Sequence, residues 1–129
     1  MHASFTFPGD TRVEGRVGSF TVLTDQPPDA SAPTPFTLFL MSIGACAAYY
    51  VLAFCRQRGI STEGICVVQD TDAGASGLVE RIALTIELPP EFPEKYRAAV
   101  IRAAEQCSVK KHLESPPVVT IETQVLAGA

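Results

Sequence analysis

The sequence predicts one α+β domain over residues 1–129, in which mostly antiparallel strands accompany two helices. Three observations predict this class. A long apolar segment with helix signals at both ends fills residues 34–59. Short segments of alternating polarity lie before and after it, and a second helical pattern follows near residues 93–107. The expected order along the chain is therefore β-β-β-α-β-β-α-β.

The central helix is predicted from its end signals as well as its composition. No charged residue occurs between Ala30 and Cys55. Thr34 is a suitable N-cap, and Pro35 suits the first helical turn, where its missing N–H removes no hydrogen bond. Gly59 is suited to a helix C-terminus, because it adopts a left-handed conformation without steric cost. We expect a helix buried on all sides by other protein elements.

Composition excludes several classes of partner. The net charge of −4 leaves no basic stripe for nucleic acid. The charge-free run is long enough for a membrane span, but the polar and small residues within it and the alternating segments around it favour a core helix. The first ten residues lack the basic and apolar regions of a signal peptide, so a cytoplasmic protein without a membrane partner is expected.

The strands are predicted from period-two alternation between turn signals. Three are expected in the N-terminal part, at residues 3–7, 11–16 and 19–24, followed by a proline-rich loop over 25–33. Two more are expected at 63–71 and 78–88, around a turn at 72–77. In the second of these, four apolar side chains face one way: Ile82, Leu84, Ile86 and Leu88.

The C-terminal part is predicted to hold a helix, a turn and a strand. Pro93 opens the second helix, which Cys107 is expected to close. Residues 108–113 are expected to form a short turn. After Pro116 and Pro117 break the chain, alternation over residues 118–126 predicts a final strand.

The four cysteines are too irregularly spaced for a secreted disulfide scaffold. Cys55 and Cys66 are interpreted as small core residues. Cys46 and Cys107 lie on the apolar faces of their helices, and such helices commonly pack at about 8–10 Å between axes. The pair is therefore either a packed part of the core or a reactive dithiol, and the spacing leaves both open.

Other chemistry receives little support from the residues. Cys107 and His112 are the only close Cys–His pair, so neither a metal nor another cofactor is expected. A cysteine in the middle of a helix gains nothing from the N-terminus of that helix. Reactivity at Cys46 would then need a cation from elsewhere, and the candidates are Arg12, Arg16, Lys110 and Lys111.

Two stretches of this sequence resemble a known family. The first runs from Thr34-Pro35 through Leu38-Phe39 and Gly44-Ala45-Cys46 to Arg58-Gly59-Ile60, and the second is Ala104-Glu105-Gln106-Cys107-Ser108-Val109. They are similar to the central helix and the second cysteine motif of the OsmC/Ohr family. The likeness covers nearly the whole chain.

The resemblance implies an intertwined homodimer with mostly antiparallel sheets wrapped around two central helices. Active members of this peroxiredoxin-like antioxidant family reduce organic hydroperoxides during oxidative stress. Carried over to this chain, Cys46 is the peroxidatic cysteine and Cys107 the resolving one. A dithiol reductant, either a small dithiol or a dithiol protein, then reopens their disulfide. An apolar channel beside the helix would bind the substrate, and Phe36, Phe39 and Tyr50 are the residues expected there.

This sequence departs from the family pattern at three places. Phe36 stands where family members carry a glutamate, and Ser108 stands where the second motif usually has proline. No arginine aligns cleanly with the family's activating one, so Arg12 or Arg16 is the expected activator. Without it, the pKa of Cys46 is expected at about 8.5 or above. The alternatives are a non-catalytic dimer that binds a hydrophobic small molecule and a slow thiol redox sensor.

Overall fold

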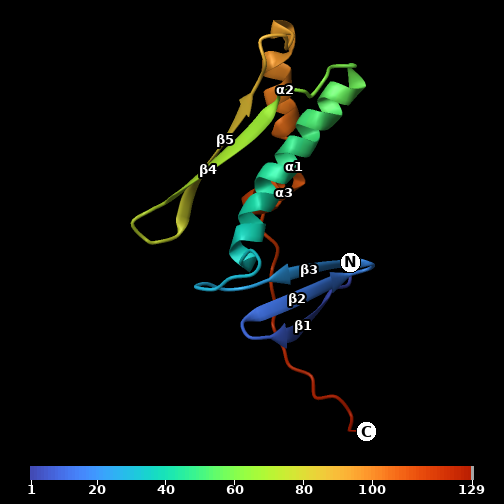
Figure 1. Ribbon diagram of the computed structural model, residues 1–129, viewed down its shortest axis with the longest axis vertical. Helices are drawn as coiled ribbons and strands as arrows, with labels where there is room; N and C mark the ends of the chain where they lie inside the picture. Colours follow the sequence, from blue (N-terminus) through green and yellow to red (C-terminus); the bar gives the residue numbers. More distant parts are fainter. Residues whose placement is uncertain (129) are drawn as a thin grey trace.

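The computed structural model describes residues 1–128 and contains two antiparallel sheets connected by one long helix (Figure 1). The first sheet has the order β1-β2-β3, from strands Ser4–Gly9, Arg12–Val17 and Phe20–Thr24. The second is the hairpin of β4, Cys66–Ala73, and β5, Val79–Glu87. Every strand pair is antiparallel, which confirms the predicted α+β class.

Helix α1, Pro35–Gln57, confirms the predicted central helix. The N–H of Thr37 donates to the Thr34 hydroxyl at 3.1 Å, and Gly59 has a φ of +63° just beyond the C-terminal end. By length and composition α1 could cross a membrane, a property that the core helix of a soluble protein shares. One face of α1 is buried, through Ile43, Ala47, Val51, Phe54 and Cys55. The expected burial on all sides was wrong for the single chain, because large apolar side chains such as Met41 and Tyr49 are exposed on the other face.

The main core lies between the C-terminal half of α1, the β4–β5 hairpin and the following helix. Val51, Phe54 and Cys55 of α1 meet Phe92 and Val100 there. Partly buried apolar side chains of both strands cover this cluster. The hairpin therefore packs against the end of α1 that the first sheet does not reach (Figure 1).

Strand β4 begins three residues later than predicted. Gly64 has a φ of +82°, and the N–H of Ile65 donates to the carbonyl of Thr62 at 3.0 Å. These contacts form a turn where the prediction placed the start of the strand, and pairing with β5 begins at Cys66. Cys66 is exposed, so its interpretation as a core residue was wrong for the single chain. The early part of the predicted strand was wrong because alternation continues through the turn.

The second predicted helix is divided into three. A 3₁₀ turn, η1, covers Glu94–Tyr96, α2 covers Arg97–Ala104, and a separate helix, α3, covers Ser108–Glu114. The N–H groups of Gln106 and Cys107 donate to carbonyls three residues earlier, which ends α2. The prediction that Cys107 closes the second helix was therefore wrong. Cys107 serves instead as the N-cap of α3.

The predicted final strand over residues 118–126 was wrong for this single chain. The segment has no strand pairing, and it extends away from the helices to the C-terminal end (Figure 1). Its apolar side chains are almost fully exposed, for example 94% for Ile121 and 95% for Val125. A strand needs a hydrogen-bonding neighbour, and among the described residues none lies beside this segment.

The loop that leads into α1 is held by the carboxylate of Asp25, which is only 5% exposed. It accepts hydrogen bonds from the Thr11 hydroxyl at 2.6 Å and from the N–H groups of Gln26 and Ser31, each at 2.8 Å. The Ser31 hydroxyl donates to it as well, at 2.8 Å. These bonds, with the Ser31 amide as the largest cause, hold the pKa of Asp25 far below its ordinary 3.8.

This carboxylate predicts a pH-dependent contribution to stability. Because its pKa is lower in the folded chain, the contribution is complete above the unfolded value of about 3.9 and disappears as pH falls below it. We expect Asp25→Asn to lower the denaturant midpoint at pH 7, and this deficit to shrink between pH 5 and pH 3. Urea unfolding of both proteins across that range measures it. A deficit that is the same at every pH would contradict the role of the charge.

Candidate functional site

The structure brings Cys46 and Cys107 together. Cys46 is half-buried in the middle of α1, and Cys107 is 1% exposed directly before α3. Each thiol is among the groups that shift the pKa of the other, so the two side chains are neighbours. Cys107 Sγ also lies 3.9 Å from the carbonyl oxygen of Ile43, one turn before Cys46. Two residues that are 61 positions apart in the sequence thus form one dithiol site.

Cys107 is held as a thiol. Burial is the largest cause that raises its pKa, and the hydrogen bond that its S–H donates to Cys46 raises it further. The N–H of Lys110 donates to Cys107 Sγ at 3.4 Å, which partly opposes the shift. This bond also caps α3, so the sulfur of Cys107 is fixed at the first turn of that helix.

Cys46 has the opposite tendency. Its pKa is lowered from 9.0 to about 7, first by the backbone N–H of Val109 and then by the thiol of Cys107. The hydroxyl and backbone N–H of Ser108 contribute as well, and the Oγ–Sγ distance is 3.7 Å. Together these hydrogen bonds outweigh burial, which raises the pKa. The expectation that only a cation could activate Cys46, and that its pKa would otherwise stay near 8.5, was therefore wrong.

The packing of α3 against α1 explains why these donors reach Cys46. The N–H groups in the first turn of a helix have no partner within the helix, so they are free to bind a nearby acceptor. The first turn of α3 is placed beside Cys46, although Cys46 itself is far from the ends of its own helix. The sequence prediction missed Ser108 and Val109 in this role, because residues 108–113 were expected to form only a turn.

Gln69 is a further residue that the sequence prediction missed. Its Nε2 donates to the carbonyl oxygen of Leu40 at 3.0 Å, which fixes β4 against α1 close to Cys46. The side chain lies over Gly44, where a Cβ atom would come within 2.6 Å of Gln69 Oε1. A glycine inside an apolar helix was the available signal of such a close approach.

The two candidate arginines lie in strand β2, away from the dithiol within this chain. Arg12 Nε donates to the carbonyl oxygen of Gly9 at 3.4 Å, and its guanidinium is 4.0 Å from Asp10. Arg16 is exposed on the same strand. Neither arginine is among the groups that shift the pKa of Cys46. Their role as activators stays a prediction.

The three aromatic residues expected to bind substrate lie along α1 on both sides of Cys46. The rings of Phe36 and Phe39 stack with centroids 5.9 Å apart, and both side chains are exposed. Tyr50 meets Tyr49 edge-to-face at 5.6 Å. None of the three lines a described cavity, so their contact with substrate also stays a prediction.

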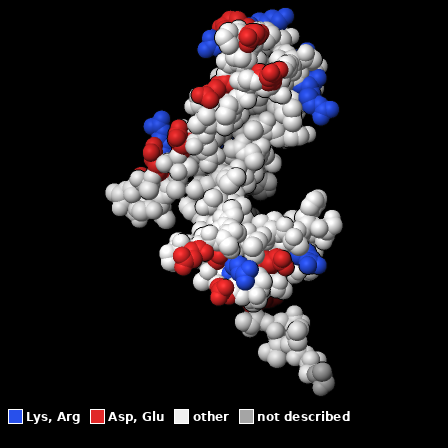
Figure 2. All heavy atoms as spheres, viewed as in Figure 1, with Lys and Arg blue, Asp and Glu red and all other residues white. Residues whose placement is uncertain are grey.

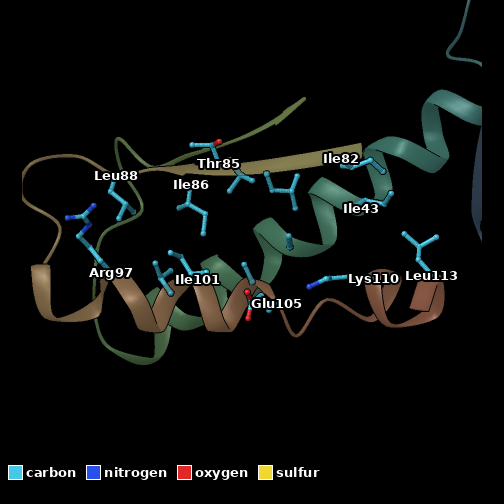
Figure 3. A pocket seen from close by; sticks show the side chains of 15 residues that line it. Ile43, Ile82, Thr85, Ile86, Leu88, Arg97, Ile101, Glu105, Lys110 and Leu113 are labelled. Atoms are coloured by element: carbon cyan, nitrogen blue, oxygen red, sulfur yellow. The ribbon is translucent and has the colours of Figure 1, made fainter. Parts of the chain in front are cut away.

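A cavity of about 580 Å³ lies between the β4–β5 hairpin and the three helices (Figure 3). Its apolar wall includes the four side chains predicted to share one face of β5, namely Ile82, Leu84, Ile86 and Leu88. Ile43 and Ala47, on either side of Cys46 in α1, form part of the opposite wall. Neither Cys46 nor Cys107 is among the residues that line the cavity.

Three charged residues are also part of the cavity lining: Arg97, Glu105 and Lys110. Figure 3 shows Arg97 at one end of the cavity, near Leu88, and Lys110 toward the other end, near Leu113. The cavity suits an apolar group with a polar end. Among residues 1–128, no three His, Cys, Asp or Glu side chains gather closely enough to bind a metal ion.

Comparison with solved structures finds the same fold in several bacterial proteins. A provisionally named osmotic stress-induced and detoxification response protein from Psychrobacter arcticus 273-4 superposes with a TM-score of 0.70 at 21% identity, over 84% of this chain and 85% of that one. An OsmC-like protein from Mycoplasma pneumoniae gives 0.70 at 12% identity, over 89% and 87%. A hypothetical protein from Aquifex aeolicus VF5 gives 0.64 at 13% identity, over 89% and 87%.

Sequence comparison points the same way. No protein with a curated description matches the chain significantly. The family model described as OsmC-like protein, however, matches residues 28–122, which include α1, both cysteines and most of the C-terminal segment. The chain therefore belongs to the OsmC-like protein family.

Proposed function

We propose that this protein is a cysteine-based peroxidase that reduces organic hydroperoxides through Cys46 and Cys107. The observation that carries the proposal is the contact between two thiols with opposite pKa shifts. Cys46 has a pKa of about 7 and is therefore about half thiolate at neutral pH. The raised pKa of Cys107 keeps it protonated until it is needed. Membership of a family with a stress-response relative is consistent with this role.

The first step is attack by the thiolate of Cys46 on the terminal oxygen of the hydroperoxide. A bond forms between sulfur and that oxygen, and the O–O bond breaks. The alkoxide leaves and takes a proton to become the alcohol, while Cys46 becomes a sulfenic acid. The sulfur is oxidised by two electrons and the peroxide is reduced by two.

In the second step, the sulfur of Cys107 attacks the sulfenic sulfur of Cys46. The S–S bond forms, and the hydroxyl leaves with the proton of Cys107 as water. A dithiol reductant then reopens the disulfide by thiol exchange and restores both thiols. The two side chains are already neighbours, which supports this step.

The cavity behind Ile43 and Ala47 supports an organic substrate. Burial of an alkyl group there gains about 25 cal/mol per Å² of apolar surface, whereas hydrogen peroxide has no such group. The hydroperoxide must reach the sulfur of Cys46 either from this cavity or from the exposed face of α1. Phe36, Phe39 and Tyr50 remain the proposed substrate contacts on that exposed face.

The protein is also proposed to act as a homodimer. Aromatic and aliphatic side chains of α1 are exposed, including Phe36 at 54% and Tyr49 at 61%. Figure 2 shows that the middle of the molecule, over α1, is almost free of charged side chains. Such a large apolar surface marks an association site, and a second copy offers the matching surface. In that dimer, a partner's Arg12 or Arg16 could approach Cys46.

A second copy also explains the unpaired C-terminal segment. Its alternating residues have the pattern of a strand, and the two-stranded β4–β5 sheet has free edges. Two-stranded sheets are marginally stable alone, so an added strand from the partner would stabilise this one. The four free cysteines of the chain suit a reducing compartment, which supports a cytoplasmic location.

The apolar cavity favours one alternative function, a non-catalytic dimer that binds a hydrophobic small molecule. A slow redox sensor is a third candidate, since it would form the disulfide without cycling. Native mass spectrometry of protein purified under mild conditions tests the binding hypothesis. A retained lipid-like ligand together with no peroxide turnover would favour it over the peroxidase.

Turnover itself is tested by peroxide consumption in the presence of dithiothreitol. We expect cumene hydroperoxide to be consumed at least about tenfold faster than hydrogen peroxide, because only the former gains from apolar burial. Peroxidase function would be excluded if the protein consumed neither peroxide faster than dithiothreitol alone does. Equal catalysed rates would retain a peroxidase but contradict the organic substrate.

A further inference from the structure

We propose that Ser108 is a further catalytic residue of this reaction, because it supplies two hydrogen-bond donors to the reacting sulfur of Cys46. The donors are its side-chain hydroxyl and its backbone N–H. The catalytic meaning of this contact rests on the proposed peroxidase function, but the contact itself can be tested without any peroxide.

The geometry gives the hydroxyl a clear role. Ser108 Oγ lies 3.7 Å from Cys46 Sγ, within hydrogen-bonding reach of a sulfur atom. A thiolate can only accept hydrogen bonds, so the hydroxyl must donate when Cys46 is ionised. The backbone N–H of the same residue is also among the groups that favour the thiolate of Cys46, with the smallest effect of those named. Hydrogen bonds to an ionised acceptor are stronger than those between neutral groups, so both favour the thiolate.

The backbone of Ser108 is fixed from two sides. Cys107, directly before it, caps α3 through the bond from the Lys110 N–H. His112 Nδ1 lies 2.6 Å from the carbonyl oxygen of Ser108, an arrangement that needs the Nδ1–H tautomer. The hydroxyl is thus presented to Cys46 by a residue whose main chain is held in place.

The groups around Cys46 that favour its thiolate are neutral hydrogen-bond donors and not cations. They are Ser108 and Val109 of α3 and Cys107 directly before it, and of these only Cys107 ionises. Gln69 of β4, which packs on α1 at Gly44, is uncharged. The side chain of Lys110 lines the cavity. Within residues 1–128, no charged side chain is among the groups that shift the pKa of Cys46.

Two substitutions remove the donors in steps. Ser108→Ala removes the hydroxyl and keeps the N–H, whereas Ser108→Pro removes both. Proline is well accepted here, because Ser108 is the first residue of α3 and Cys107 before it has an extended ψ of 121°. Ser115→Ala, at the other end of α3, is the matched control.

The measurement is the rate of iodoacetamide alkylation of Cys46 as a function of pH, followed by peptide mass spectrometry. Exposed Cys66 serves as the internal reference. At pH 7 we expect the rate at Cys46 to fall about twofold in Ser108→Ala and about fivefold in Ser108→Pro, with the inflection moving to higher pH in the same order. Ser115→Ala should match the unmodified protein. Circular dichroism confirms that the variants remain folded.

Two outcomes decide the proposal. Unchanged pH profiles in both folded variants would overturn it, whatever the peroxidase activity proves to be. Shifted profiles establish Ser108 as a donor to Cys46, and slower cumene hydroperoxide reduction in the same order then makes that donor catalytic. Shifted profiles in a protein that reduces no peroxide would retain the contact and reject the peroxidase function alone.

Discussion

Cys46→Ser is expected to reduce the consumption of organic hydroperoxide to the background rate, a loss of about a thousandfold or more. The serine hydroxyl occupies the same place but is essentially un-ionised at neutral pH, so no nucleophile attacks the peroxide. The hydrogen bonds from Val109 and Ser108, which lower the pKa of Cys46 to about 7, then have no thiolate to stabilise. Peroxide consumption with excess dithiothreitol measures the loss.

Two further variants make this experiment specific. Without dithiothreitol, Cys107→Ser should still consume one equivalent of hydroperoxide rapidly, and Cys46 should then be trapped as a sulfenic acid that a dimedone probe labels. Cys66→Ser, which changes an exposed cysteine in β4, should keep the full rate. Full activity in Cys46→Ser would remove Cys46 from the mechanism, and loss of activity in Cys66→Ser would show that another thiol takes part.

The double substitution Val119→Asp and Ile121→Asp is expected to convert a dimer into monomers. Both side chains are highly exposed in the single chain and lie on the same side of the alternating segment. If a partner buries them, each contributes about 1.5–3 kcal/mol, and a carboxylate in their place adds a desolvation cost. The dissociation constant should therefore rise at least about a hundredfold.

Sedimentation velocity from 1 to 100 μM would measure this change. The control is Thr120→Asp with Gln124→Asp, which adds the same charge to the opposite side of the segment and should leave the dimer intact. Dimers that survive the Val119 and Ile121 substitutions would place the interface elsewhere. An unmodified protein that sediments as a monomer at 100 μM would reject the homodimer itself.

The parts of the fold that were predicted correctly are those with local causes. The cap at Thr34, the proline after it and Gly59 define α1 within a few residues of its real ends. The apolar face of β5 follows directly from period-two alternation. In each case the signal and the structure that it specifies lie within the same short stretch of chain.

The parts that failed depend on contacts between distant segments. Alternation over residues 118–126 was real, but a strand forms only beside a partner, which the described residues 1–128 do not supply. The pairing of Cys46 with Cys107 was one of two open alternatives, because helix patterns do not fix which faces meet. The donors from α3 were missed for the same reason, since their effect on Cys46 requires α3 to begin beside the middle of α1.

The most direct test of the central claim is mass spectrometry of the reduced protein after brief treatment with one equivalent of cumene hydroperoxide. We expect a Cys46–Cys107 disulfide to form within seconds, with a mass loss of about two hydrogens, while Cys55 and Cys66 stay reduced. Excess dithiothreitol should restore both thiols and permit a second round. Four thiols that remain reduced after treatment would contradict the claim, and the site would then be part of the core.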